Sequence, residues 1–403
     1  MKLAQRMDHI GTETAFEAAA RARALADSGR DIVHLHLGEP DFDTPPNIVE
    51  AARRALGDGQ THYAPPLGVP AFRDAIAADF SRRRGVIVSP DRVVVTPGAK
   101  PVMAYALMAL VGPGDEVIVP DPGFPIYESM TRFMGATPVP IPLRVEHGFR
   151  MDLDELRSLI TSRTRMLFFN SPHNPTGGVL TREDIEGIAS IAMANDIVVL
   201  ADEIYARILY EGEHHSILAV EGMDERTIVL DGLSKTYAMT GWRLGWGILP
   251  PSLVPVFTRL LINTVSCTAT YAQLAGAEAL NGPQDAVDAM VAEFRARRSL
   301  IVDGLSELPG VSAPMPSGAF YAFPDVGGTG LDGQIFAERL LQKAGVSVLS
   351  GTAFGAQATS SLRVSYANSQ ENISVALERM GGFIAALADG SRTDGSPVAE
   401  GSR

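Results

Sequence analysis

The chain has 403 residues, of which 46% are hydrophobic and 20% charged, and it carries a formal net charge of −13. This length and composition are typical of a globular protein with a sizeable core, and they favour two domains over one. The negative charge argues against nucleic acid or an anionic membrane as a partner, because both attract basic surfaces.

Three features of the sequence bear on where the protein resides. The first residues, MKLAQRMDHIGTETAF, contain no continuous apolar stretch of the kind found in signal peptides. The longest apolar run, at residues 102–111, is too short to cross a bilayer and predicts a buried helix. The only cysteine, Cys267, excludes an intrachain disulfide and favours a reducing compartment. We therefore expect a cytoplasmic protein.

Short runs rich in β-branched and aromatic residues alternate with helical patterns through the middle of the chain. A helix is predicted from Thr181 to residue 194, with Asp184 placed so that it nearly completes a capping box. Alternating strands and helices predict βαβ units, and hence an α/β fold in which helices cover both faces of a mostly parallel sheet. The predicted strands cover residues 92–96, 116–120, 165–170, 197–202, 227–231 and 243–249.

The C-terminal part of the chain has a different pattern. A charged amphipathic stretch at residues 283–308 is expected to lead out of the large domain, and the pattern beyond it is α+β. There we predict strands at 319–323, 346–349 and 362–366, and helices at 332–344 and 370–387. We expect residues 46–285 to form the large domain, residues 1–45 and 286–388 a discontinuous smaller domain, and the Gly/Ser-rich tail at 389–403 to be disordered.

Several polar or glycine-rich motifs lie where a predicted strand ends, which is where open parallel sheets bind ligands. In TPGAKP, the amides of Ala99 and Lys100 at a helix N-terminus would favour a phosphate, although an ordinary strand-to-helix turn has the same sequence pattern. In NSPHNPTGG, Pro175 stiffens the loop so that the Asn174 amide can donate to a ligand. A capped turn would explain the proline and the glycines there, but not Asn170 at the strand end.

Two further strand ends carry candidate ligand-binding residues. An aspartate at the end of a buried strand is costly unless it meets a cation or hydrogen-bond donors. Asp202, in ADEIYARI, could therefore hold a protonated pyridine nitrogen, and Tyr205 could bond a phenolate oxygen. Asp202 could equally cap a following helix, and Tyr205 could fill the core. Phe124, in DPGFPIY, could stack on a planar ring or pack beneath its own loop.

Lys235 is the most informative single residue. It lies in DGLSKTYAMTGWRLGW among small and apolar neighbours, eight positions before Arg243. Such surroundings favour the neutral amine, which is a nucleophile toward a carbonyl carbon. A lysine that forms a Schiff base, a phosphate-binding turn and partners for a pyridine ring together describe one planar, phosphorylated cofactor.

These motifs make the sequence similar to the fold-type I pyridoxal-phosphate aminotransferases, the aspartate aminotransferase superfamily. The resemblance covers residues 35–369 and is carried by LGEPDFDTP, NPTG and SKTYAMTGWRLG. It implies a large domain with a mostly parallel seven-stranded sheet between helices and a smaller α+β domain. It also implies pyridoxal 5′-phosphate as the cofactor, and no metal site is expected.

The resemblance assigns roles toward the cofactor to matching residues. Lys235 would form the Schiff base and shuttle a proton, and Asp202 would keep the ring nitrogen protonated. Tyr205 and Asn174 would contact the ring oxygen, and Phe124 would stack on the ring face. The phosphate would be bound by Arg243 and by the amides of Ala99 and Lys100. Ser234 or the backbone would complete the phosphate site, since Gly232 stands where many relatives carry a hydroxyl.

Other implied roles concern the substrate and a partner subunit. Arg363, in LRVSYANS, would clamp the substrate α-carboxylate through its planar fork, with Gly38 and Asn174 beside it. Tyr63, in HYAPPLG, resembles the tyrosine that reaches the phosphate of the neighbouring subunit, which implies a homodimer.

The implied activity is transfer of an amino group from an L-amino acid to a 2-oxo acid by a ping-pong mechanism. Lys100 matches a lysine of aspartate-specific members, so aspartate or glutamate is the leading donor. Glu13 and Ala15 stand where those members have Ser and Thr, and a glutamate would repel an acidic side chain. A carbon–sulfur β-lyase or another lyase on the same scaffold is the main alternative. An inactive regulator and a binding protein would not need the lysine, aspartate and arginine set.

Overall fold

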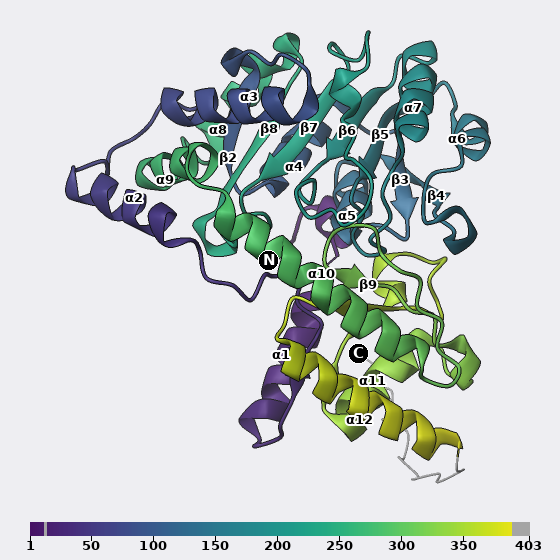
Figure 1. Ribbon diagram of the computed structural model, residues 1–403. Helices are drawn as coiled ribbons and strands as arrows, with labels where there is room; N and C mark the ends of the chain where they lie inside the picture. The colour runs from purple at the N-terminus through teal and green to yellow at the C-terminus, as the bar shows by residue number, and fades with distance from the viewer. Residues whose placement is uncertain (12–13, 389–403) are drawn as a thin grey trace.

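The computed structural model describes residues 1–11 and 14–388. Its largest element is a seven-stranded sheet, and a smaller α+β part lies beneath that sheet in Figure 1. The strand order is β2–β8–β7–β6–β5–β3–β4, and all neighbouring pairs are parallel except the two made by β8. The strands are β2 (Val93–Pro97), β3 (Glu116–Asp121), β4 (Thr137–Pro142), β5 (Thr164–Asn170), β6 (Val198–Asp202), β7 (Thr227–Gly232) and β8 (Leu244–Ile248).

The predicted strands of this sheet are confirmed to within one residue at either end, and the predicted α/β fold is confirmed with them. One strand, β4, was not predicted. It lies at the edge of the sheet, where it pairs only with β3.

Helices cover both faces of the sheet because its strands alternate their side chains between the two faces. Met166 and Phe168 of β5 pack against α4 (Lys100–Leu110), α5 (Pro125–Phe133) and α8 (Val254–Thr264). Leu167 and Phe169, on the other face, pack against α6 (Leu153–Leu159) and α7 (Arg182–Ala194). Further along that face, β2, β7 and β8 pack against α2 (Pro46–Gly57), α3 (Pro70–Arg84) and α9 (Thr270–Asn281).

Local signals explain where two of the helices begin and end. The capping box at α7 is confirmed: the Asp184 carboxylate accepts from the Thr181 N–H at 2.8 Å, and the Thr181 hydroxyl accepts from the Asp184 N–H at 3.2 Å. The helix α11 (Gly333–Ala344) starts after Asp332, whose carboxylate accepts from the Ile335 N–H at 2.8 Å. It ends at Gly345, whose φ of 68° suits glycine.

The smaller part contains two short sheets and long helices. Strand β1 (Val33–His34) pairs with β10 (Val346–Ser347), and β11 (Leu349–Ser350), β12 (Leu362–Ser365) and β9 (Tyr321–Ala322) form a second sheet. The prediction of one strand at 346–349 is therefore wrong, since that segment supplies strands to both sheets. The strand predicted at 319–323 is shorter than expected. The helices are α1 (Thr14–Asp27), α10 (Asp285–Ser306), α11 and α12 (Gln370–Ala388).

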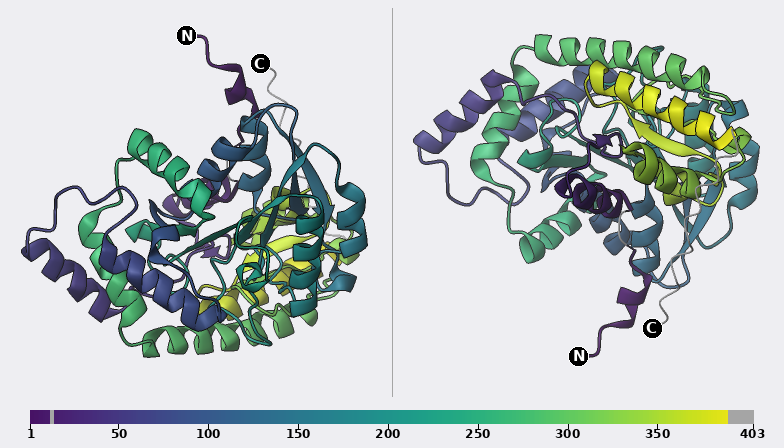
Figure 2. Two further views of the ribbon diagram at one scale, coloured as in Figure 1. Left: turned by 90° about the horizontal axis from the view of Figure 1, so that it is seen from above. Right: turned by 90° about the horizontal axis from the view of Figure 1, so that it is seen from below.

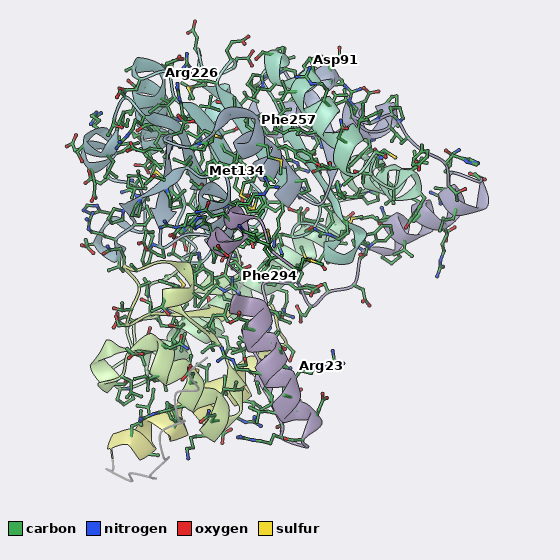
Figure 3. The ribbon with its side chains drawn as sticks, turned by 180° about the vertical axis from the view of Figure 1, so that it is seen from behind. Arg23, Asp91, Met134, Arg226, Phe257 and Phe294 are labelled. Atoms are coloured by element: carbon green, nitrogen blue, oxygen red, sulfur yellow. The ribbon has the colours of Figure 1, made fainter. Side chains whose placement is uncertain are left out.

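The long helix α10 runs beneath the sheet-bearing part, and Figure 2 shows it beside α12. Phe257 and Phe294, both labelled in Figure 3, are fully buried: the first in the core around α4 and α8, the second in the core of the smaller part. Within the described part of the chain, no helix is long and apolar enough to cross a membrane. The prediction for the tail at 389–403 lies outside the described residues.

The topology gathers several chain segments at one edge of the large sheet. Strands β2, β3, β5, β6 and β7 all end there, and the antiparallel strand β8 begins there. The loops that follow these five strands, and the residue that precedes β8, therefore face a common space.

Candidate active site

One cavity of about 470 Å³ opens at this edge of the sheet. It contains nearly all the site residues predicted from the sequence, although these are spread over more than 300 positions of the chain. The predicted residues that line it are Gly38, Ala99, Lys100, Phe124, Asn174, Asp202, Tyr205, Ser234, Lys235, Arg243 and Arg363.

Lys235 follows β7 and is half-buried in the cavity wall. Its Nζ donates to the backbone carbonyl of Gly38 at 2.6 Å. A Cβ on Gly38 would lie 2.3 Å from the Tyr321 hydroxyl oxygen, so only glycine allows this close approach. The lysine is therefore held against a segment almost 200 residues away, and its neighbours Ser234 and Thr236 are buried.

Asp202 is the last residue of β6, and its side chain is buried. One carboxylate oxygen accepts from the Tyr127 hydroxyl at 2.6 Å and the other from the Ile204 N–H at 3.2 Å. Burial raises the pKa of Asp202 to about 6, an effect that these hydrogen bonds only partly offset. Residues 203–207 form a turn and a short irregular stretch rather than a helix, so Asp202 is not a helix cap. A cation placed beside Asp202 would favour its ionised form.

We predict that Asp202→Asn stabilises the cofactor-free protein at neutral pH. The pKa of Asp202 is higher in the folded chain than the ordinary value of 3.8, so its contribution to stability is full below about pH 4 and is lost as the pH rises to about 6. At about 1.4 kcal/mol for each unit between the ordinary and the folded-state pKa, the free energy of unfolding falls by on the order of 3 kcal/mol. Thermal unfolding of cofactor-free protein at pH 4 and pH 7 measures it. A wild-type Tm that falls no more than that of Asp202→Asn would contradict the prediction.

Asn170 links the Asp202 strand to the loop that carries Asn174. Its Nδ2 donates to the backbone carbonyl of Asp202 at 2.9 Å, and its Oδ1 accepts from the Asn174 N–H at 2.8 Å. These two hydrogen bonds explain why NSPHNPTGG contains a second asparagine. Asn170 positions Asn174 against β6, and its own side chain also reaches the cavity wall.

Arg363, on β12, is a buried cation with a fixed orientation. Its Nη1 donates to Oδ1 of Asn174 at 3.1 Å, and its Nη2 donates to the backbone carbonyl of His36 at 2.6 Å. The guanidinium lies against the rings of Tyr321 and Phe354, with its carbon 4.6 and 4.8 Å from the two ring centres. Its Nε has no hydrogen-bond partner among the described residues. A planar cation held in this way suits a carboxylate ligand.

Tyr205 and Phe124 form two walls of the cavity. The Tyr205 hydroxyl hydrogen-bonds that of Tyr321 at 2.7 Å, and burial raises the pKa of Tyr205 well above its usual range, so the phenol stays protonated. Phe124 precedes α5, and the ammonium of Lys100 lies 5.4 Å from the centre of its ring. Both aromatic residues therefore line the cavity as well as packing against protein.

The turn before α4 and Arg243 form a cradle for an anion. A Cβ on Gly98, whose φ is +84°, would lie 2.1 Å from Nη2 of Arg243, so the guanidinium lies directly against this turn. Gly245 is needed for the same reason, since its Cβ would lie 2.4 Å from the backbone nitrogen of Ala99. Arg243 itself has a φ of 54°, and its Nη1 donates to the Thr240 carbonyl at 2.8 Å. A helix N-terminus beside a guanidinium is a favourable place for a phosphate.

Sequence reasoning missed several residues that line the cavity, above all Tyr127 and Tyr321. Tyr127 stood in the quoted motif DPGFPIY, three residues after Phe124. The signal that could have identified Tyr127 is its position in the first turn of a helix that starts at the sheet edge. Tyr321 carried no signal, because its role depends on the packing of β9 against Gly38 and Tyr205. Leu37, Glu39, Met103, Ile204, Leu230 and Thr240 complete the lining.

Two predictions fall outside this cavity. Tyr63 is 89% exposed and does not line it. Glu13 and the side chain of Ala15 lie outside the described part of the chain, so the structure does not bear on their expected effect on substrate choice.

Comparisons with known proteins identify the family of the chain. The family described as aminotransferase class I and II matches residues 30–380. The aspartate aminotransferase of Pyrococcus horikoshii is 41% identical over 352 residues, which is 87% of this chain and 90% of that protein. The arginine–pyruvate transaminase of Pseudomonas aeruginosa is 40% identical over 366 residues, 91% and 93% of the two chains. The crystal structure of Thermus thermophilus aspartate aminotransferase with maleate superposes with a TM-score of 0.91 at 41% identity, covering 95% of this chain and 99% of that one.

Proposed function

The chain belongs to the class I and II aminotransferases, which depend on pyridoxal phosphate, and from this premise we propose that it moves the amino group of an acidic L-amino acid to a 2-oxo acid. The observation that carries the choice of substrate is that the cavity holds the side chains of Arg363 and Lys100 in addition to those of Lys235 and Arg243, which are assigned to the cofactor. An acidic amino acid offers two carboxylates, one for Arg363 and one for Lys100.

The cavity fits the cofactor on several independent grounds. The buried Asp202 carboxylate, whose pKa is raised by burial, would be favoured by a protonated ring nitrogen. The Gly98 turn and Arg243 provide the anion cradle, and Ser234 lies beside Lys235 in the same wall. When bound, pyridoxal 5′-phosphate supplies an aldehyde that condenses with amines and a ring that withdraws electrons from the substrate α-carbon.

The residues of the chain then supply positioning and proton control. We assign to Nζ of Lys235 the covalent attachment of the cofactor and the proton transfer at the α-carbon. Asn174 accepts from Arg363 through Oδ1, so its Nδ2 is the group that can donate to a ligand, and the protonated hydroxyl of Tyr205 lies in the same cavity. Arg363 orients the α-carboxylate, with the backbone of Gly38 beside it, and the lack of a Cβ at Gly38 lets the Tyr321 hydroxyl approach this segment.

A half-reaction screen tests the substrate class. Each L-amino acid is added to the protein that carries its cofactor, and loss of the visible absorbance is followed. We expect aspartate and glutamate to react fastest, and Lys100→Ala to lower kcat/KM for both by about tenfold, the loss of one charged hydrogen bond, while alanine is unaffected. Lys343→Ala, an exposed lysine on α11, is the matched control.

Three outcomes of this screen would contradict the proposal. Preference for arginine or lysine would show that Lys100 does not select the side chain and would direct attention to Glu39, which lines the cavity together with Asp202. An equal loss with alanine would show that Lys100 serves the cofactor only. Release of ammonia with an amino-acid donor, instead of transfer to a 2-oxo acid, would indicate a lyase.

We further propose a homodimer in which Tyr63 completes the phosphate site of the partner subunit. Its support is the exposure of Tyr63 in a chain whose other predicted site residues all line the cavity. A monomeric active species in sedimentation would contradict this proposal.

The domain division and the compartment are also proposals. We place the cofactor-binding domain at residues 46–285 and the smaller domain at 1–45 and 286–388, supported by an apolar core built mainly from α10, α11, α12 and their neighbouring strands, to which the large domain contributes residues between 204 and 210. A cytoplasmic location is supported by the single cysteine.

A further inference from the structure

A buried carboxylate outside the predicted site joins the two parts of the molecule. Asp121 is the last residue of β3 and is 7% exposed. Its Oδ2 accepts from the Ala356 N–H at 3.2 Å and its Oδ1 from the Gln357 N–H at 3.3 Å. Two residues further on, the Gly123 N–H donates to the carbonyl of Phe354 at 2.7 Å. The turn after β3 is thus bonded at three points to a loop of the smaller part.

The loop is shaped to meet this carboxylate. Gly355 has a φ of 150°, and a Cβ at this position would lie 1.8 Å from Oδ1 of Asp121. No other residue can bring the loop backbone this close. Burial raises the pKa of Asp121, and the two backbone N–H groups lower it. Burying a carboxylate costs free energy unless donors are placed to meet it, so the Asp121 carboxylate and the loop at Gly355 must meet in one geometry.

One side of this junction carries a residue that lines the cavity, and the other carries a residue that contacts a lining side chain. On one side, Phe124 follows the turn directly and lines the cavity. On the other, Phe354 ends the short 3₁₀ helix Gly351–Phe354, and its ring lies 4.8 Å from the guanidinium carbon of Arg363. The junction therefore fixes the distance between the side chain expected to stack on the cofactor ring and the side chain that backs the carboxylate clamp.

We propose that Asp121 is a positioning residue that holds the Arg363 clamp in register with the cofactor ring, by fastening the Phe354 loop to the turn before Phe124. The proposal rests on the proposed function, since it takes Arg363 as the group that binds the substrate carboxylate. Asp121 acts through Phe354 and Arg363 and does not touch the substrate.

The test separates positioning from a general effect on stability. Asp121→Ala is expected to raise KM about tenfold for every amino acid and 2-oxo acid, the size of losing one charged hydrogen bond, while kcat and the visible spectrum of the bound cofactor change by less than about twofold. Asp121→Asn keeps the volume and one acceptor and should fall between; it supplies the readout if the alanine variant does not fold. Asp154→Asn, an exposed carboxylate on α6 paired with Arg157, is the control and should leave KM unchanged.

A double-mutant cycle with Gly355 adds a second readout. Gly355→Ala should raise KM in the wild-type background and raise it much less in the Asp121→Ala background, because the oxygen that its Cβ would meet is gone. Independent effects of the two substitutions would overturn the proposal, as would an unchanged KM in folded, cofactor-bearing Asp121→Ala.

Measuring Arg363→Ala in parallel separates a failure of the positioning role of Asp121 from a failure of the proposed carboxylate clamp. If Arg363→Ala raises KM and Asp121→Ala does not, only the positioning role fails. If Arg363→Ala also leaves KM unchanged, the carboxylate clamp of the proposed function fails with it.

Discussion

Replacing Lys235 with alanine is expected to abolish transamination, with a fall in kcat of about 10³-fold or more, because one side chain supplies both the covalent attachment and the proton transfer. Lys235 lines the cavity, and its Nζ donates to the Gly38 carbonyl at 2.6 Å. The variant should still bind the cofactor through the anion cradle and Asp202. Steady-state kinetics gives the rate, and borohydride reduction followed by peptide mapping locates the attachment.

The control for this prediction is Lys343→Ala, which removes an exposed lysine and should keep full activity. Lys235→Arg keeps the positive charge but cannot supply a neutral amine, and it should be as inactive as the alanine variant. Activity of Lys235→Ala within about tenfold of wild type, or reductive labelling of another lysine, would place the attachment elsewhere.

Arg363→Ala is expected to raise KM for every amino acid by about 30-fold or more, since truncating one partner of a buried charged pair costs about 2–5 kcal/mol. The cofactor should stay bound, because the groups assigned to hold it, which are Lys235, Asp202 and the anion cradle, remain in the variant. Steady-state kinetics with several amino acids, together with the visible spectrum, measures both effects.

Arg363→Lys provides the graded comparison. A lysine keeps the charge but loses the planar fork and the contacts with the Tyr321 and Phe354 rings, so its KM should lie between those of wild type and Arg363→Ala. Arg379→Ala, which removes a peripheral arginine paired with Asp31, should leave KM unchanged. An equal KM for all four proteins would show that the α-carboxylate binds elsewhere.

The strand that the sequence failed to predict has a physical explanation. β4 reads TPVPIP, and three prolines in six residues argue against a strand because proline cannot donate to a ladder. The sheet tolerates them because β4 is an edge strand, with β3 on one side only. Position within the sheet, which is a tertiary property, decided this element.

The segment at 346–349 also shows that tertiary structure decides how strands pair. Its β-rich composition predicted one strand, and the backbone is indeed extended at both ends. Its two halves pair with β1 and with β12, partners that lie more than 300 residues before and about 15 residues after it. Periodicity shows that a segment favours extended structure but not which neighbour completes its hydrogen bonds.

The sequence by itself determined the fold class, the capped helix α7 and the residues at the strand ends, because these depend on local pattern and on residue types that suit a narrow chemistry. Lys235, Asp202 and Asn174 are of this kind, whereas the role expected for Arg363, which lies within β12, came from the family resemblance. Tertiary structure alone decided the supporting contacts: Tyr127 on Asp202, Tyr321 between Gly38 and Tyr205, and Asp121 against the loop at Gly355. These contacts join segments up to about 280 residues apart, and no local pattern records them, since each residue is ordinary until the chain folds its partner against it.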